Sequence, residues 1–295
     1  MSLNRSALSR KSSADILNKI KKSVETKKAN YDDERVWKLA RNEDGVGYAV
    51  IRFLPSPVED GSYVRPLYTH GFKSKGGWLI SECPTSVDKK CPICEHNSSL
   101  WNSGIESDKN TARDRGRRTH FLTNILVVKD PAKPENEGKV FIWGMGKKMF
   151  EKAKAILNPP EEFGEEGKNP WSFFDGLELR LKMKTVSTFP NYDDSSFVET
   201  SVPFDGDEEK LEELLNKCYD LDKYVEEIAD VNYGTLSRKF AKVIGLESDD
   251  DSEPADDVKE KIGGAKDEPA DEPKKSTNAE NDELMSYFKA LRDKS

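Results

Sequence analysis

Three cysteines in a polar stretch constrain this fold more than any other feature. Cys83, Cys91 and Cys94 lie within twelve residues, and the chain has one further cysteine, Cys218. A polar segment has no apolar core of its own, so the thiols have little packing reason to gather there. The Cys91-Pro-Ile-Cys94 spacing lets two thiolates bind one ion from a tight turn. The sequence therefore predicts that a bound metal ion holds this segment together and that the protein occupies a reducing compartment. It does not favour a disulfide-bonded scaffold.

Tetrahedral zinc needs a fourth ligand, and His70 and His96 are the candidates. His96 follows Cys94 by only two residues, which is cramped for two ligands of one tetrahedron. His70 ends a predicted strand and can reach over the site, so the spacing favours it. Four protein ligands would close the site and make one Zn²⁺ structural. Two alternatives stay open: three ordinary thiols, or a redox Cys-x-x-Cys, which would need a thioredoxin-like context.

The composition indicates a core flanked by polar tails. Of the 295 residues, 35% are hydrophobic and 35% are charged, which is too polar for one compact globule. The longest apolar runs, such as residues 125–128, are far shorter than the roughly 20 residues of a membrane span. The first residues also lack a secretory apolar region. We therefore expect no membrane partner.

Charge is distributed very unevenly along the chain. Residues 247–283 contain 15 acidic and 5 basic residues, a net charge of −10, so the total of −8 leaves +2 for everything else. This acidic segment is predicted to be disordered, whereas residues 1–30 carry eight basic side chains and two acidic ones. We expect a basic arm (1–30), a core (31–246) and an acidic tail (247–295) with a short amphipathic end. The alternative is that both tails only aid solubility.

Apolar periodicity predicts a mainly β fold with α additions. The predicted strands are residues 48–54, 64–72, 78–81, 121–128, 139–143 and 177–186. The predicted helices are residues 148–157 and 207–229, with a short basic one near residues 12–24. Residues 83–118 are predicted to be irregular. Cys218 falls on the apolar face of its helix and is predicted to be a buried thiol, not a ligand.

A basic stretch is bracketed by aromatic residues. Five cationic side chains crowd ten residues, with only Asp114 opposing them: Lys109, Arg113, Arg115, Arg117 and Arg118. Trp101 precedes the stretch and Phe121 follows it. Cations that hold phosphates and rings that stack on bases are the requirement for binding single-stranded nucleic acid. Each ring could instead pack in the core, and the arginines could form a solvated loop, but their combination favours binding.

No catalytic motif competes with this interpretation. The chain has no phosphate-binding Gly-x-x-x-x-Gly-Lys-[Ser/Thr] loop, no Gly-x-Ser-x-Gly and no His-Glu-x-x-His. We therefore expect a protein that is not an enzyme. Two alternatives are kept: a metal-dependent nuclease, for which Asp193-Asp194 could hold the ion, and a scaffold that binds only proteins.

Several blocks of sequence resemble a known family. Residues 49–55 (AVIRFLP), His70-Gly-Phe, the cysteine pattern, and residues 123–131 and 134–141 are similar to the single-stranded DNA-binding, or helix-destabilising, proteins of T-even-type phages. The resemblance runs from about residue 5 to 245. It implies an OB-fold core with an inserted zinc subdomain (about 66–120). The implied zinc ligands are His70, Cys83, Cys91 and Cys94.

The resemblance also implies how such a chain would act. The basic arm, through Arg10, Lys11, Ser12 and Ser13, would contact a neighbouring copy head to tail on DNA. The acidic tail would recruit viral replication and recombination proteins. The chain would coat single-stranded DNA cooperatively and without sequence preference during replication, recombination and repair in the bacterial host cytoplasm. The implied DNA-contacting residues are Arg52, Trp101, Arg115, Arg117, Arg118, Phe121, Trp143, Phe189 and Tyr192.

Overall fold

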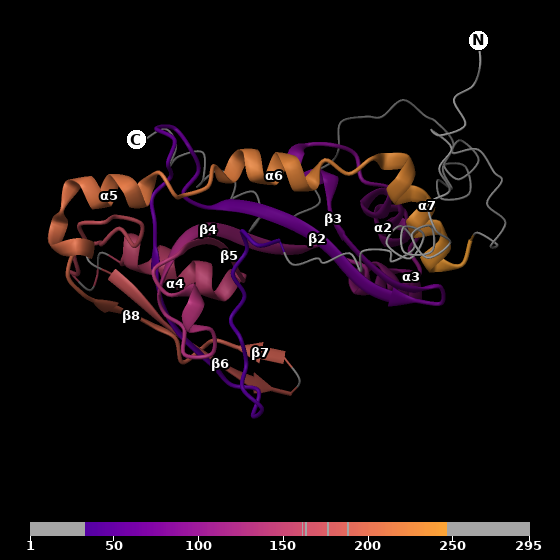
Figure 1. Cartoon of the computed structure of the whole chain (residues 1–295). Helices are drawn as coiled ribbons and strands as arrows, with labels where there is room; N and C mark the ends of the chain where they lie inside the picture. Colours follow the sequence, from indigo (N-terminus) through magenta and orange to yellow (C-terminus); the bar gives the residue numbers. More distant parts are fainter. Residues whose placement is uncertain (1–32, 161, 163, 176, 188, 247–295) are drawn as a thin grey trace, which may run out of the picture. The chain divides into compact units, whose positions relative to one another are not determined.

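The computed structural model describes residues 33–160, 162, 164–175, 177–187 and 189–246 (Figure 1). Contacts divide the chain into one unit that ends at Val36 and a second that begins at Trp37. All interactions described below lie within the second unit. The predicted cooperativity residues, the predicted N-terminal helix and the acidic tail lie outside the described residues.

The described strands form one antiparallel sheet, in the order β3-β2-β4-β1-β6-β7. β5 pairs with β4 and β8 pairs with β6, beside this path. The strands are β1 (Gly47–Phe53), β2 (Arg65–Ser74), β3 (Gly77–Glu82), β4 (Arg118–Lys129), β5 (Val140–Met145), β6 (Leu177–Val186), β7 (Phe189–Asn191) and β8 (Ser196–Glu199). The six predicted strands agree with β1–β6, while the two short strands β7 and β8 were not predicted.

The helices depart further from the expectation. They are α2 (Pro92–Asn102), α3 (Glu106–Asp114), α4 (Lys147–Leu157), α5 (Glu208–Leu215), α6 (Leu221–Ala229) and α7 (Tyr233–Ile244), with 3-10 turns such as η2 (Pro84–Val87). The prediction that residues 83–118 are irregular is wrong, because α2 and α3 form there. Residues 207–229 hold two helices, since Asp220 caps α6 by accepting hydrogen bonds from the backbone of Asp222 and Lys223.

Strand β4 is the centre of the sheet. It pairs with β2 near Arg118–Leu122, with β1 near Ile125–Lys129 and with β5 along Phe121–Leu126. Both of its faces are covered from Phe121 to Val127, which explains its continuous apolar run instead of an alternating one.

One face of β4 packs into the main core. Phe121 stacks on Phe150 of α4, with ring centroids 4.4 Å apart. Phe53 of β1 lies 5.5 Å from the Trp171 ring and 6.1 Å from the Trp143 ring. Aromatic pairs of this kind add about 0.5–1.5 kcal/mol to the free energy gained by burial. This cluster joins β1, β4, β5 and β6 to α4.

The opposite face of β4 packs against the helices that follow the sheet. Leu126 lies in a second cluster with Leu211 and Leu214 of α5, and Cys218 packs against it. Burial raises the pKa of the Cys218 thiol to about 12, so the thiol stays protonated. The predicted contact of Cys218 with apolar core residues agrees with this position, but the residue is half-buried and follows the end of α5 instead of lying within a helix. In the part of the chain that the structure describes, no helix combines the length and apolar character needed to cross a lipid bilayer.

A buried amide ties β4 to the segment between α5 and α6. Asn124 is 1% exposed; its amide group donates to the Tyr219 carbonyl at 2.8 Å and accepts from the Tyr219 backbone N–H at 2.9 Å. Asn124→Ala leaves both backbone groups without partners, so the free energy of unfolding should fall by about 2–4 kcal/mol. Denaturant unfolding measures this, and Val128→Ala at the exposed end of the strand should change it by less than half as much.

Candidate metal centre and basic surface

Four side chains converge on one point. The ligand atoms of His70, Cys83, Cys91 and Cys94 all lie within 4.8 Å of one another, and they form the one such His/Cys/Asp/Glu group among the described residues. The Cys91 and Cys94 sulfurs each lie 3.5 Å from His70 Nε2, and the Cys83 and Cys94 sulfurs are 3.6 Å apart. Tetrahedral zinc with ordinary bond lengths requires separations of roughly 3.5–3.8 Å. The donor set therefore fits a zinc ion in both chemistry and size.

Local structure sets the position of each donor. His70 lies in β2, where it pairs with Ser81 of β3, and Cys83 follows directly after β3. Cys91 is the extended residue that precedes α2, and Cys94 lies in the first turn of that helix. Pro92 suits the first position of α2, because proline has no N–H to leave unpaired there.

A small core of its own surrounds this group. Phe72, Leu79 and Ile93 pack with the ligands, and Leu236 and Phe240 of α7 complete the cluster from far along the sequence. Tyr233, at the start of α7, donates a hydrogen bond to Glu95 of α2 at 2.6 Å. The packing around the donors thus extends beyond the predicted range of about 66–120.

His96 does not take part in the group. Its ring packs edge-on against Phe240, with centroids 5.2 Å apart, and its Nδ1 has no hydrogen-bond partner. Burial, followed by the charge of Arg115, lowers the pKa of His96. The structure therefore places His70 with the cysteines, as the spacing favoured.

The donors of this group shift one another's pKa values. His70 Nδ1 lies 3.3 Å from the Arg115 carbonyl, an arrangement that directs Nε2 toward the sulfurs. Burial lowers the pKa of His70, but hydrogen bonds to Cys83 and Cys91 outweigh it and raise that pKa to about 9. Hydrogen bonds from Cys91 and Cys94 lower the pKa of Cys83. A metal ion would take the place of these protons, because only deprotonated ligands bind it.

The basic stretch is attached to this group. The Arg115 carbonyl faces His70 and also accepts a hydrogen bond from the Asn97 side chain. The guanidinium of Arg115 lies 5.6 Å from the Phe72 ring centroid. Arg117 stacks over Tyr68 at 4.2 Å and donates to Thr85 Oγ1 at 2.9 Å.

The Thr85 hydroxyl is in turn 3.0 Å from the Cys83 sulfur. Thr85 and Tyr68, which no sequence motif identified, thus connect an exposed arginine to a ligand.

Two of the predicted aromatic contacts are exposed. Trp101 of α2 is 47% exposed, and the Arg113 guanidinium lies 5.2 Å from its ring centroid. Phe189 of β7 is 72% exposed. Tyr192 is half-buried against the main core, and burial raises its pKa. Trp101 therefore lies against the basic stretch, whereas Phe189 lies on a separate hairpin.

Three predicted DNA contacts lie in the interior instead. Phe121 and Trp143 belong to the main core, because they occupy the inner face of the β4–β5 hairpin that packs on α4. Arg52 is 2% exposed and donates to the carbonyls of Ser201 at 2.9 Å and Phe173 at 3.3 Å. In this structure Arg52 fastens two loops to β1, and the two rings are turned away from solvent.

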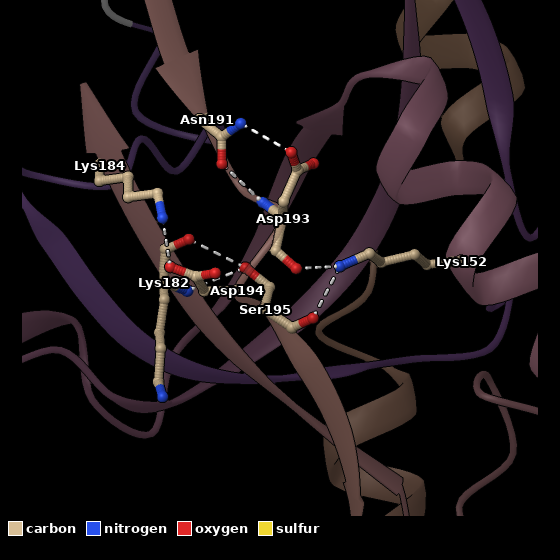
Figure 2. Close-up of polar contacts among 7 residues, drawn as sticks. All are labelled: Lys152, Lys182, Lys184, Asn191, Asp193, Asp194 and Ser195. Atoms are coloured by element: carbon tan, nitrogen blue, oxygen red, sulfur yellow. Dashed lines mark hydrogen bonds and ion pairs between the residues drawn. The ribbon is translucent and has the colours of Figure 1, made fainter. Parts of the chain in front are cut away.

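The acidic pair of the nuclease alternative faces cations (Figure 2). Asp194 pairs with Lys184 at 2.8 Å and Asp193 lies 3.6 Å from Lys148. Lys152 donates to the backbone carbonyls of Asp193 and Ser195. Carboxylates that neutralise lysines lack the cluster of oxygen ligands that a catalytic divalent ion requires. This arrangement gives no support to a nuclease centre.

The ligand assignment can be tested with a matched pair of variants. His70→Ala should reduce zinc affinity by more than the 10–100-fold that loss of an outer-shell partner costs, whereas His96→Ala should leave it nearly unchanged. Competition with a chromophoric chelator measures the affinity. Equal losses in both variants would contradict the assignment.

Comparison with known proteins places the chain in a family. Residues 45–244 match the family model described as gp32 DNA binding protein like. The chain is 36% identical over 239 residues to the single-stranded DNA-binding protein of Enterobacteria phage T4, covering 80% of this chain and 79% of that protein. It is also 36% identical over 240 residues to the single-stranded DNA-binding protein of Enterobacteria phage T2, with the same coverage.

Proposed function

The chain belongs to the gp32-like family of phage DNA-binding proteins, and on this premise we propose that it binds single-stranded DNA during viral DNA replication, recombination and repair. The observation that carries the proposal is the cationic and aromatic surface beside the metal group. Arg117 and Arg118 are exposed there, and Trp101 offers a ring beside Arg113. Such a surface can hold phosphates and stack on bases without reading their sequence.

We further propose that the metal is one structural Zn²⁺. The group has four protein donors within 4.8 Å of one another, and three of the donor pairs lie 3.5–3.6 Å apart, so four protein ligands would leave no position for a substrate. When bound, zinc would supply a tetrahedral link between β2, the residue after β3, and α2. The chain's own residues then carry the basic stretch: the Arg115 carbonyl faces His70, and Thr85 joins Arg117 to Cys83.

The core is proposed to be an OB-fold within residues 31–246, with the zinc subdomain inserted at about 66–120. Support comes from β1, which is flanked by β4 and β6, and from the enclosed aromatic core beneath α4. In this arrangement α7 is an addition that covers the zinc subdomain from the C-terminal side.

Binding should depend on salt and on Trp101. The wild-type chain should quench its tryptophan fluorescence on titration with oligo(dT), and the logarithm of its affinity should fall with the logarithm of salt by about 0.7 per phosphate neutralised. Trp101→Ala should cost roughly 1–3 kcal/mol of binding free energy if one base stacks on that ring. Trp78→Ala, which removes an exposed ring on β3 outside the basic stretch, is the control and should cost much less.

Cooperativity and partners are assigned to the two tails. The basic arm, through Arg10, Lys11, Ser12 and Ser13, is proposed to contact the next copy head to tail on DNA. The acidic tail is proposed to recruit viral replication and recombination proteins in the cytoplasm of the bacterial host, and to compete with DNA for the basic surface. The opposite charges of the two segments support this division.

Truncations separate these roles. Deleting residues 1–20 should abolish cooperative binding to long poly(dT) while leaving the affinity for an oligonucleotide of one site nearly unchanged. Deleting residues 247–295 should increase the melting of duplex DNA, because a competing polyanion is removed. An equal loss of both affinities after the first deletion would instead make the arm part of the binding surface.

The chain is proposed to act without catalysis. Its relatives carry the names of binding proteins, and Asp193 and Asp194 pair with lysines. Incubation of end-labelled oligonucleotide with Mg²⁺ or Mn²⁺ should give no cleavage. Cleavage that is lost in Asp193→Asn would favour the nuclease alternative, and absence of any oligo(dT) binding would favour the protein-only scaffold.

A further inference from the structure

Cationic side chains line one face of strand β6. Buried apolar residues alternate with exposed polar ones from Leu179 to Lys184, so Arg180, Lys182 and Lys184 project from the same solvent-facing side. Successive members of this row lie about 6.8 Å apart, because each residue of an antiparallel strand rises about 3.4 Å. The strand therefore presents regularly spaced positive charges to an extended polyanion.

Two exposed aromatic rings share this face. Tyr48 of β1 is the register partner of Lys182, and directly paired residues in an antiparallel sheet project to the same side. Phe189 of β7 is paired with Val186, which continues the row on β6. Tyr48 is 55% exposed and Phe189 is 72% exposed. The face thus combines cations with available ring surfaces, as the stretch near Trp101 does.

We propose that this face of β6 is a second DNA-contacting surface, on which Arg180 and Lys182 bind backbone phosphates and Tyr48 stacks on a base. The inference rests on the proposed binding of single-stranded DNA and extends it to a part of the sheet outside the basic stretch. Phosphodiester groups are the fitting ligand because the row is regular, exposed and cationic, and because an unpaired strand also supplies bases to the ring.

The turn after β7 partly neutralises this face. Asp194 holds Lys184 at 2.8 Å, whereas the Lys182 side chain extends away from Asp194 (Figure 2). Lys152 fixes the turn through the carbonyls of Asp193 and Ser195. A phosphate can bind Lys184 only if it displaces the Asp194 carboxylate, which already pairs with that lysine. Arg180 and Lys182 are therefore the primary contacts, and Asp194 limits the contribution of Lys184.

The test is the salt dependence of oligo(dT) binding. Arg180→Gln/Lys182→Gln should reduce the magnitude of the slope of log affinity against log salt by about 1.4, which corresponds to two phosphates on a single strand. The matched control is Lys217→Gln/Arg238→Gln, which removes one exposed lysine and one exposed arginine from outside this face and should leave the slope unchanged. Asp193→Asn/Asp194→Asn should increase the magnitude of this slope, because Lys184 then becomes available to bind a phosphate.

Aromatic stacking is tested separately at Tyr48. Tyr48→Ala should weaken oligo(dT) binding by about fivefold or more, and Tyr48→Phe should restore it, because a stacked base needs the ring and not the hydroxyl. Thermal unfolding of each variant checks that the fold is intact. Should the double variant on β6 fail to fold, Lys182→Gln alone is measured, with an expected slope change of about 0.7.

The outcomes distinguish the two proposals. Failure of the wild-type chain to bind oligo(dT) at low salt would remove the proposed function. Normal wild-type binding with an unchanged slope in Arg180→Gln/Lys182→Gln would leave that function intact and overturn the assignment of this face. Equal changes in the double variant and in its control would also overturn it, since the effect would then be one of net charge.

Discussion

The convergence of one imidazole and three thiols organises a polar segment of this protein. The segment from Cys83 to Arg118 forms two short polar helices that bury little apolar surface between them. Donor atoms within 4.8 Å of one another join a strand pair to the first of these helices. Without that link, only the small core around Ile93, Leu236 and Phe240 would offset the ordering entropy of the segment.

The same group positions the cations beside it. The Arg115 carbonyl faces the imidazole, and Arg117 reaches Cys83 through the Thr85 hydroxyl. Arg117 also stacks over Tyr68, which restricts its rotamers before any ligand arrives. A basic side chain that is held in place loses less entropy on binding a phosphate than one on a free loop. The zinc subdomain is thus proposed to contribute preorganisation, while the arginines contribute the charge.

The alternation of the sheet decides which rings can meet a ligand. Phe121 and Trp143 lie on the inner face and fill the core, whereas Tyr48 and Phe189 project outward. Each of these four aromatic residues lies in or beside a strand, or has a basic residue near it in the sequence. Local composition therefore does not distinguish the buried rings from the exposed ones. The separation follows from pairing and register, because a side chain's face depends on which neighbours cover its strand.

Much of the fold and the whole donor set followed from local patterns. The six longer strands, helix α4 and the choice of His70 over His96 could be predicted, because strand alternation and ligand spacing act over a few residues. Helices α2 and α3 could not, since their polar sequences have a weak apolar stripe and depend on packing against distant residues. Helix α7 covers the metal group from more than 130 residues away in sequence, and nothing local signals that contact.

The sequence by itself determined the chemistry available to this protein: soft donors at metal-binding spacing, a cationic stretch with aromatic neighbours, and tails of opposite charge. Only the tertiary structure decided which of those groups reach solvent. It buried Arg52, Phe121 and Trp143 and exposed Tyr48. The reason is that composition and spacing are properties of the chain, whereas exposure depends on contacts between segments that are far apart along it.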